Sequence, residues 1–322
     1  MANDRPSAAR FASVLMVAAL LAPIVSHAEP LAIVAAVKGR VTVTGGRGGP
    51  PIVAAFGRAL ERGDRMVVPA GGAATIFFND GNVIELAEKS AITIGGRVAA
   101  RPHGERSGGL PGEVYANVSR FVSGGSRETG LVALSALRGN PGPVALLLEP
   151  RATELLDVRP AFRWRAMEGA VRYRLTVSGD PGELWSRELA DTALEYPADA
   201  APLAAGGSFL WEVRALGPGG ELRHEESFFH VLAEADAAPV RAALERIGGS
   251  AGGPEAPAAR FLSGSYLSGH GLYRDAAGQF EALCRLSPES PAPHEALGNV
   301  YRAVGLMDLA AAEYQQALTL SR

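Results

Sequence analysis

The chain contains a single cysteine, Cys284, among its 322 residues. One thiol cannot form an intramolecular disulfide, and it cannot supply a zinc or redox site that is built from cysteines. Its apolar neighbours Phe280, Leu283 and Leu286 predict a small buried hydrophobe in preference to a reactive thiol. The folded chain therefore has to be stabilised by packing alone.

Blocks of basic charge and long hydrophobic runs are also scarce. The 31 Lys and Arg residues are interspersed with 34 Asp and Glu residues, and the formal net charge is -3. This distribution offers no electrostatic footprint for DNA or RNA, so we exclude nucleic acid as a partner. After the first 28 residues, no apolar run is long enough to cross a bilayer.

No catalytic signature is present. The sequence contains no H-E-x-x-H, G-x-S-x-G, Walker A or G-x-G-x-x-G pattern. Neighbouring acids, such as Glu183 with Glu188 or Glu225 with Glu226, could serve a glycosidase, but adjacent acids usually face solvent. We therefore expect a protein that is not an enzyme and has neither catalytic residues nor a bound cofactor.

A metal or sugar site has little support. His224 and His230 share the parity of one predicted strand, but no third ligand lies at a fixed spacing, so an exposed strand edge is the preferred interpretation. Trp164 and Trp211 alternate with apolar neighbours, which predicts a sandwich core. Trp185 follows a Gly-rich turn, and a sugar-stacking role for it stays open. We expect no metal site.

The first 28 residues have the pattern of a secretory signal. Arg5 and Arg10 precede the uncharged run 11–25, and Ser26-His27-Ala28 offers small residues to a signal peptidase. We expect cleavage after Ala28 and a periplasmic or secreted protein. The alternative, an uncleaved anchor, is disfavoured because the run has only 15 residues and a membrane-spanning helix needs about 20.

Residues 31–98 are expected to form short strands separated by Gly and Pro. The predicted strands are 33–37, 41–44, 65–68, 74–78, 83–86 and 91–94. A two-residue loop at Asp80-Gly81 would place Phe77 opposite Ile84, with apolar residues on both faces of the pair. The alternative for the stretch 79–82, a calcium loop, has too few oxygen ligands. We therefore expect residues 31–98 to fold into a compact β-sandwich or roll.

Five segments of this region carry a resemblance. They are Val37-Lys38-Gly39-Arg40-Val41, Leu60-Glu61-Arg62-Gly63-Asp64-Arg65-Met66, Ala73-Ala74-Thr75-Ile76, Asp80-Gly81-Asn82-Val83-Ile84-Glu85-Leu86 and Ser90-Ala91-Ile92-Thr93-Ile94. Together they resemble a FecR domain over residues 33–96, which implies an all-β domain within 29–98. FecR-type regulators place an anti-sigma segment and a membrane helix before this domain. The sequence has the pattern of a signal peptide there, so we do not expect this chain to have the regulatory role of those proteins.

The middle of the chain combines a connector with a second β region. Residues 99–152 are Gly-rich and include a predicted helix at 113–122, whereas alternating apolar residues in 153–232 predict an antiparallel sandwich. The segments Pro160-Ala161-Phe162-Arg163-Trp164 and Phe209-Leu210-Trp211-Glu212-Val213 resemble a fibronectin type III module. Phe209 stands where such modules commonly carry the corner tyrosine, so the resemblance implies that this hydroxyl hydrogen bond is missing.

The last quarter of the chain contains an internal repeat. Residues 233–257 are predicted to form a helix at 240–247 and then a flexible Gly-rich linker. After the linker, a spacing of 34 residues relates Gly264 to Gly298 and Phe280 to Tyr314. Residues 258–322 thus resemble two tetratricopeptide repeats, which are helical hairpins. By this resemblance the first helices line a concave face for a protein partner. The residues expected on that face are Phe261, Ser265, Ser268, Glu295, Asn299 and Arg302.

The sequence therefore predicts a multidomain chain with an all-β N-terminal domain, a β-sandwich middle domain and an all-α C-terminus. We expect an exported, non-catalytic envelope scaffold or binding protein whose β modules contact cell-wall polysaccharide or protein and whose repeats recruit a protein partner. The alternative is a FecR-like signalling component acting through a separate membrane partner. Self-association is also expected, because no polar capping helix follows the last predicted helix, 309–320.

Overall fold

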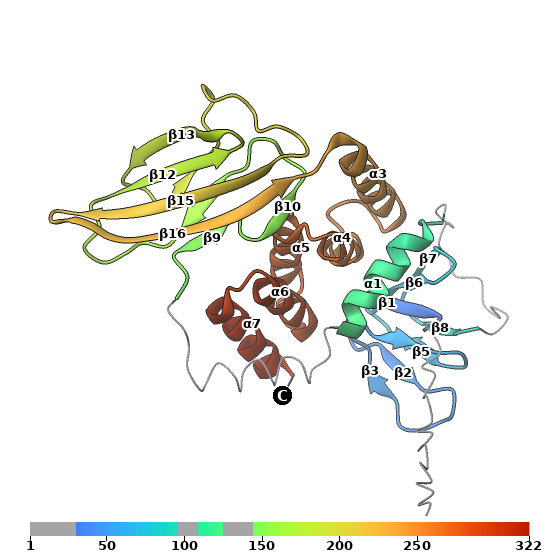
Figure 1. Ribbon diagram of the computed structural model, residues 1–322. Coiled ribbons are helices and arrows are strands. Elements are labelled where there is room, and N and C mark those ends of the chain that lie inside the picture. Colours follow the sequence, from blue (N-terminus) through green and yellow to red (C-terminus); the bar gives the residue numbers. More distant parts are fainter. Residues whose placement is uncertain (1–29, 96–108, 125–143, 322) are drawn as a thin grey trace, which may run out of the picture.

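The computed structural model describes residues 30–95, 109–124 and 144–321. The expected signal peptide lies outside these residues. Two β-rich parts flank a group of helices formed by the C-terminal part of the chain (Figure 1). The predicted order, β then β then α, is confirmed at this level. No helix in the described ranges combines the length and the hydrophobicity of a membrane span.

The N-terminal part consists of two four-stranded sheets, ordered β4-β1-β6-β7 and β3-β2-β5-β8. The strands are β1 (Ala32–Lys38), β2 (Thr42–Thr44), β3 (Ile52–Val53), β4 (Ala59–Leu60), β5 (Arg65–Val68), β6 (Ala73–Phe78), β7 (Val83–Leu86) and β8 (Ser90–Thr93). Alternate residues such as Val34, Ile76 and Met66 are buried in one core between the sheets. The other face of the first sheet, which carries Ile33 and Phe77, is buried against helices.

The turn between β6 and β7 is one residue longer than the sequence predicts. Phe77 lies opposite Val83 and not opposite Ile84, so every predicted cross-strand pair is wrong by one residue. The loop has three residues, 79–81, because Gly81 adopts a φ of +86° and closes it in the left-handed region. An Asp-Gly pair suits both loop lengths.

The carboxylate of Asp80 caps this turn. Oδ1 accepts a hydrogen bond from the backbone N–H of Asn82 at 3.0 Å, and Oδ2 accepts one from the side-chain amide of Asn82 at 2.7 Å. The stretch at 79–82 is therefore a turn, as predicted, and Asp80 stabilises the chain reversal locally.

The helix expected at 113–122 is confirmed as α1 (Gly112–Gly124). Val114 and Val118, one turn apart, are buried with the outer residues of the first sheet. The ring of Tyr115 meets that of Phe77 edge-on, with centroids 5.3 Å apart. Helix α1 thus covers part of the sheet and packs on α4, which itself contacts β1 (Figure 1).

The middle part is a second pair of sheets, ordered β10-β16-β15-β12-β13 and β14-β11-β9. Its strands are β9 (Leu147–Glu149), β10 (Thr153–Leu155), β11 (Phe162–Trp164), β12 (Arg172–Gly179), β13 (Gly182–Leu189), β14 (Ala193–Leu194), β15 (Ser208–Gly217) and β16 (Gly220–Val231). Because β9 pairs with β11, this sandwich begins before residue 153, and the predicted connector 99–152 is too long by one strand.

The aromatic residues of this sandwich form its core. Trp164 and Trp211 are buried, as predicted. Trp185, which the sequence leaves open, is also buried, and its ring meets those of Phe162 and Tyr196 edge-on. Sugar stacking on Trp185 is therefore ruled out by burial.

Helix α3 (Glu234–Ser250) is longer than the predicted 240–247, and no flexible linker follows it. Gly252 adopts a φ of +83°, and the N–H of Gly253 donates to the carbonyl of Gly248 at 2.9 Å. These are the features of a Schellman cap, which satisfies carbonyls at a helix end. The preceding Ala251 is buried, so this Gly-rich segment is an ordered turn.

Four more helices form two hairpins. They are α4 (Pro257–Gly269), α5 (Tyr273–Leu286), α6 (Pro291–Ala303) and α7 (Met307–Leu320). A β-carbon placed on Gly264 would lie 2.8 Å from the ring of Phe280, and one on Gly298 would lie 2.7 Å from that of Tyr314. The predicted repeat of 34 residues is therefore a repeat of structure, in which glycine lets an aromatic ring pack on the helix backbone.

Candidate functional site

The first hairpin does not present the predicted partner surface. Phe261 is 3% exposed and Ser265 is fully buried. The ring of Phe261 packs on that of Phe56 in the N-terminal sandwich, with centroids 6.0 Å apart, and the Ser265 hydroxyl donates to the carbonyl of Phe261 at 2.8 Å. Ser268, one turn further, is half-buried. Phe261 and Ser265 therefore do not stand on an open concave face as predicted, because this chain already covers nearly all of their surface.

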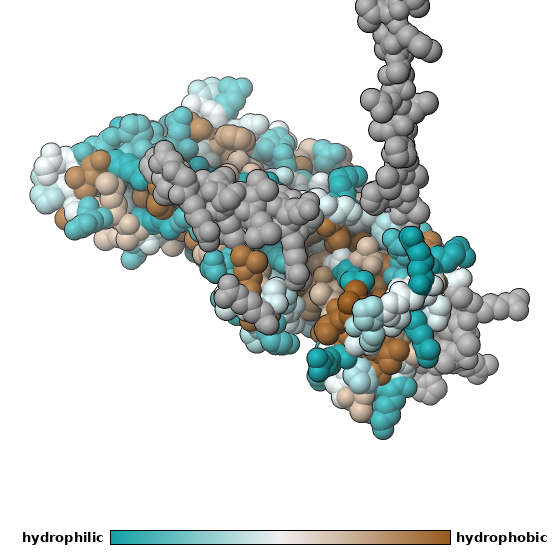
Figure 2. All heavy atoms as spheres, turned by 90° about the horizontal axis from the view of Figure 1, so that it is seen from below, coloured by the Kyte–Doolittle hydropathy of each residue, from teal (hydrophilic) through white to brown (hydrophobic). Residues whose placement is uncertain are grey.

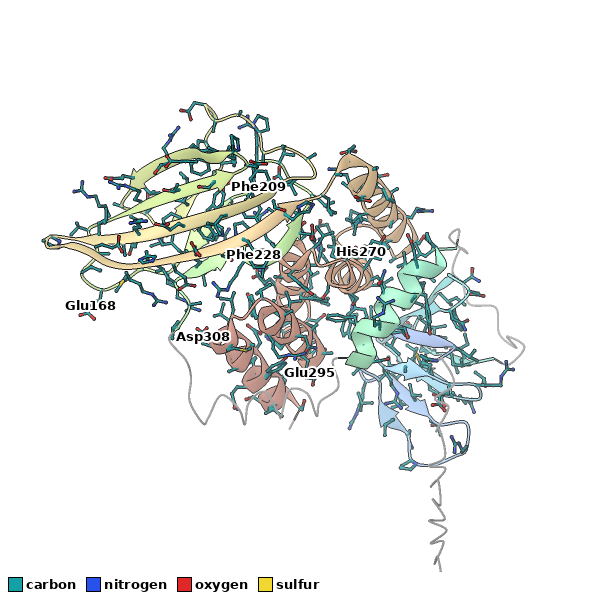
Figure 3. The ribbon with its side chains drawn as sticks, viewed as in Figure 1. Glu168, Phe209, Phe228, His270, Glu295 and Asp308 are labelled. Atoms are coloured by element: carbon teal, nitrogen blue, oxygen red, sulfur yellow. The ribbon has the colours of Figure 1, made fainter. Side chains whose placement is uncertain are left out.

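The second hairpin leaves its predicted residues half-exposed. Glu295, Asn299 and Arg302 on α6 all keep part of their surface. The hydroxyl of Tyr314 donates to Oδ1 of Asn299 at 2.8 Å, which holds the amide in place. Glu295 lies on the side of α6 that faces α1 (Figure 3).

Glu295 and Asn299 line a groove with a volume of about 100 Å³. The other lining residues, from the N-terminal sandwich, α1, α4 and α6, are Phe56, Gly57, Phe121, Val122, Phe261, Ala292 and Ala296. The floor is apolar, and one carboxylate and one amide stand beside it. This arrangement suits one aliphatic side chain with main-chain hydrogen bonds at its rim. Arg302 is not part of the lining.

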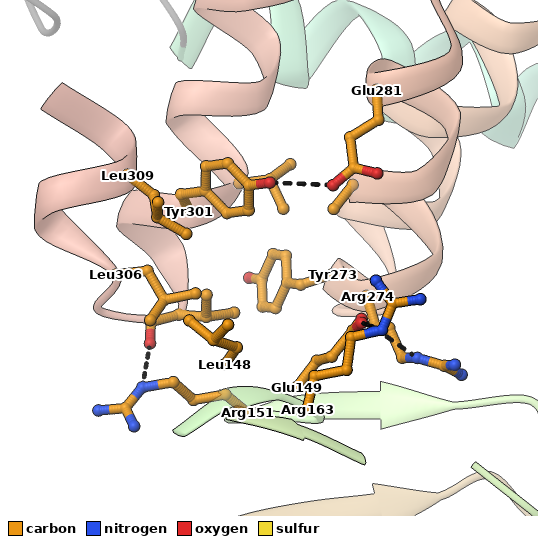
Figure 4. Close-up of a pocket in the computed structure, with 13 residues that line it drawn as sticks. Leu148, Glu149, Arg151, Arg163, Tyr273, Arg274, Glu281, Tyr301, Leu306 and Leu309 are labelled. Atoms are coloured by element: carbon orange, nitrogen blue, oxygen red, sulfur yellow. Dashed lines mark hydrogen bonds and ion pairs between the residues drawn. The ribbon is translucent and has the colours of Figure 1, made fainter. Parts of the chain in front are cut away.

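A second cavity, with a volume of about 180 Å³, lies where the hairpins meet the middle sandwich (Figure 4). The Arg151 guanidinium donates to the carbonyl of Val304 at 2.9 Å, and the hydroxyl of Tyr301 donates to Glu281 at 2.9 Å. Oε1 of Glu149 lies 3.1 Å from Nε of Arg163. The polar groups around this cavity are thus paired within the chain, which indicates an interface between domains and not a ligand site.

One member of each predicted acidic pair, Glu225 and Glu188, is engaged in structural contacts. Burial would raise the pKa of Glu225, but hydrogen bonds from the backbone of Leu146 and from Arg151, with the charges of Arg151 and Arg223, lower it overall. The Arg174 guanidinium lowers the pKa of Glu188 through a hydrogen bond. These carboxylates hold strands and loops together.

The predicted histidine pair does not form a ligand cluster. His224 contacts Glu221 at 2.8 Å, and His230 contacts Ser208 at 3.2 Å. In the described part of the chain, the one group of three converging metal ligands lies elsewhere, in the helical hairpins. The sequence gives no sign of this group, because its members come from three different helices.

Exposed apolar residues occur on the N-terminal sandwich and on α7. Val53 and Val67, 56% and 38% exposed, lie on either side of Thr42 in adjacent strands. Figure 2 shows hydrophobic side chains gathered over this domain. On α7, Met307 is the exposed large hydrophobic residue among those described, and Asp308 is held by Arg165 of the middle sandwich at 2.7 Å. Self-association through α7 stays a prediction.

Comparison with known proteins provides no assignment. No family model matches the chain. No curated protein matches it either. A multi-domain immunophilin from Arabidopsis thaliana is similar in structure at 10% sequence identity and a TM-score of 0.18, over 54% of this chain and 100% of that chain. A similarity this weak carries no argument about fold or function.

Proposed function

We propose that the chain is an exported, non-catalytic binding or scaffold protein of the cell envelope that recruits a protein partner through the groove beside Glu295 and Asn299. The observation that carries this proposal is the groove itself, which has an apolar floor with polar groups at its rim. Phe56, Phe121 and Glu295 come from three separate parts of the chain to form it. The helical hairpins thus hold the β modules and contribute to the binding surface.

Three module identities support the proposal. We infer a FecR-like N-terminal domain, a fibronectin III-like middle sandwich and a tetratricopeptide-like helical pair. The strand order β14-β11-β9 against β12, β13, β15 and β16 suits a fibronectin III-like topology. The packing of Gly264 on Phe280, repeated by Gly298 on Tyr314, suits tetratricopeptide hairpins. A fold alone does not determine a function, so the argument rests on the groove.

The small volume of the groove limits which part of a partner can enter it. A volume of about 100 Å³ accommodates one side chain of the size of valine or leucine and excludes a folded domain. We infer that the partner supplies an extended segment, whose backbone N–H groups donate to the Glu295 carboxylate. A cell-wall polysaccharide would have to bind elsewhere, on the β modules, because the floor of the groove is apolar.

Point variants test this better than truncation. A chain ending near residue 257 would expose the apolar surfaces of α1 and the N-terminal sandwich, and it would capture proteins non-specifically. We therefore compare Glu295→Lys with Glu289→Lys, which makes the same charge change on an exposed residue outside the groove. Both are built in the chain 29–322 and used as bait against envelope extract and purified peptidoglycan.

The outcomes separate the hypotheses. We expect a protein captured by the wild type and by Glu289→Lys to be lost with Glu295→Lys, while the melting temperatures of both variants stay within a few degrees of the wild type. Equal capture by all three chains would contradict a binding role for the groove. Retention of all three on peptidoglycan would place recognition in the β modules. Capture of a membrane regulator would favour the signalling alternative.

A further inference from the structure

Three metal-ligating side chains converge between consecutive helices of the hairpins. Cys284 lies on α5, His294 on α6 and Glu313 on α7, and their ligand atoms all lie within 4.8 Å of one another. The thiol sulfur of Cys284 is 3.7 Å from Nδ1 of His294. The same Nδ1 is 2.6 Å from Oε2 of Glu313. The group therefore contains a sulfur, a nitrogen and an oxygen around one point.

The geometry does not suit nucleophilic catalysis. In a nucleophile–base–orienter triad, the histidine contacts the nucleophile through one ring nitrogen and the carboxylate through the other. Here both contacts are made by Nδ1 of His294. A proton could not be passed along the ring from one neighbour to the other. Convergence on a single nitrogen is instead typical of ligands that surround a cation.

The distances are close to those of a tetrahedral zinc site. With sulfur at about 2.3 Å and nitrogen at about 2.0 Å from zinc, a tetrahedral angle separates the two ligands by about 3.6 Å. The sulfur–nitrogen distance of 3.7 Å agrees with this value. A nitrogen and a carboxylate oxygen on zinc would be about 3.4 Å apart. The distance of 2.6 Å between Nδ1 of His294 and Oε2 of Glu313 is that of a hydrogen bond. To bind zinc together with His294, the Glu313 carboxylate would therefore have to move outward by less than about 1 Å.

The surroundings favour a cation. The carboxylates of Glu313 and Glu281 place negative charge beside the Cys284 thiol, and Arg285 offsets part of it. This negative charge would stabilise a bound cation, which in turn deprotonates a coordinating thiol. The side chains of His294 and Glu313 are 15% and 24% exposed, so an ion can enter from solvent. Mixed sulfur, nitrogen and oxygen donors select zinc over magnesium or calcium.

We propose that Cys284, His294 and Glu313 bind one Zn²⁺ ion, with water in the fourth position, and that the ion links the two helical hairpins. On binding, the thiol releases its proton and Nδ1 of His294 presents its lone pair to the metal. This site departs from the expectation that the chain holds no metal. It is independent of the groove, since none of its residues lines that groove.

The test uses the full tag-free chain after removal of metal by a chelator. Zn²⁺ is added in a calorimetric titration, and Co²⁺ in a spectroscopic one that detects a thiolate-to-cobalt charge-transfer band. We expect one ion per chain, a higher melting temperature and the charge-transfer band. Cys284→Ala and His294→Gln should each lower the affinity by at least about tenfold, and Cys284→Ala should abolish the band.

His224→Gln is the control, because His224 is an exposed histidine on β16 that lies outside the cluster. It should bind Zn²⁺ like the wild type. A wild-type chain that takes up no Zn²⁺ or gives no charge-transfer band would overturn the proposal, and so would unchanged affinity in Cys284→Ala and His294→Gln. If those variants do not fold, the Co²⁺ spectrum of the wild type alone decides.

Discussion

At the scale of single residues, Gly81 shows how a turn depends on a close approach of two backbones. Its N–H and carbonyl both take part in hydrogen bonds, and the carbonyl accepts from the N–H of Leu110 at 2.8 Å. A β-carbon on Gly81 would lie 2.2 Å from the carbonyl oxygen of Leu110. The segment leading into α1 can therefore dock on this turn only if residue 81 has no side chain.

Gly81→Ala should destabilise the chain for two reasons. The left-handed φ of +86° costs an alanine about 1 kcal/mol, and the clash with Leu110 forces the two segments apart, so we expect a total loss of about 2–4 kcal/mol. Urea unfolding measures it. Gly71→Ala is the control, since Gly71 has a φ of +73° and open space around it. Equal losses in both variants would show that the close approach has no energetic effect.

At the scale of elements, each hairpin depends on a glycine under an aromatic ring. Gly298→Ala would press a methyl group against Tyr314, which is 4% exposed and cannot move away. We expect a loss of about 1–2 kcal/mol, because overpacking outweighs the gain in helix propensity. Gly278→Ala on α5 meets no atom within 4 Å and should stabilise by about 0.5–1 kcal/mol. Chemical denaturation of both variants should therefore give shifts of opposite sign.

The elements also show what the sequence can predict. The repeat was predictable because Gly264 and Gly298 stand at the same spacing from aromatic residues. The Schellman turn around Gly252 was not, since its Gly-rich composition is that of a flexible linker and only tertiary contacts bury Ala251. The hairpin register at Gly81 was missed because an Asp-Gly pair suits loops of two or three residues.

The candidate sites were predictable only in part, for a related reason. The helix face carrying Glu295 follows from the repeat, but the burial of Phe261 requires contact with Phe56, about two hundred residues earlier. No local pattern encodes such a contact. The cluster at Cys284 likewise needs the relative placement of three helices, which only the packed structure supplies.

At the scale of the whole molecule, three separate cores divide the described part of the chain. One core joins the outer face of the N-terminal sandwich, α1, α3 and the hairpins, a second belongs to the middle sandwich, and a third lies between the two N-terminal sheets. All three tryptophans lie in the second core. Tryptophan fluorescence therefore reports the middle sandwich, whereas circular dichroism at helical wavelengths reports the first core.

Phe261→Ala should separate these two signals. Removing this buried ring at the interface costs the first core about 3–4 kcal/mol, so the midpoint of the helical transition in urea should fall while the fluorescence midpoint changes little. Phe228→Ala is the control, because Phe228 is 64% exposed on β16 (Figure 3) and its truncation should cost little. Equal shifts of both midpoints in Phe261→Ala would show that the chain unfolds as one unit.

The first core contains Ile33 near one end of the chain and Val300 near the other. The N-terminal sandwich is thus complete as a pair of sheets long before one of its faces is fully covered. During synthesis, α1 can cover the part around Phe77 early, but the part that contacts α4 has to wait, because α4 begins more than two hundred residues after β1. The sandwich is therefore synthesised well before the helices that bury its apolar surface. A holding chaperone would find its binding site on the surface around Phe56, which Phe261 of α4 covers, until the C-terminal helices arrive.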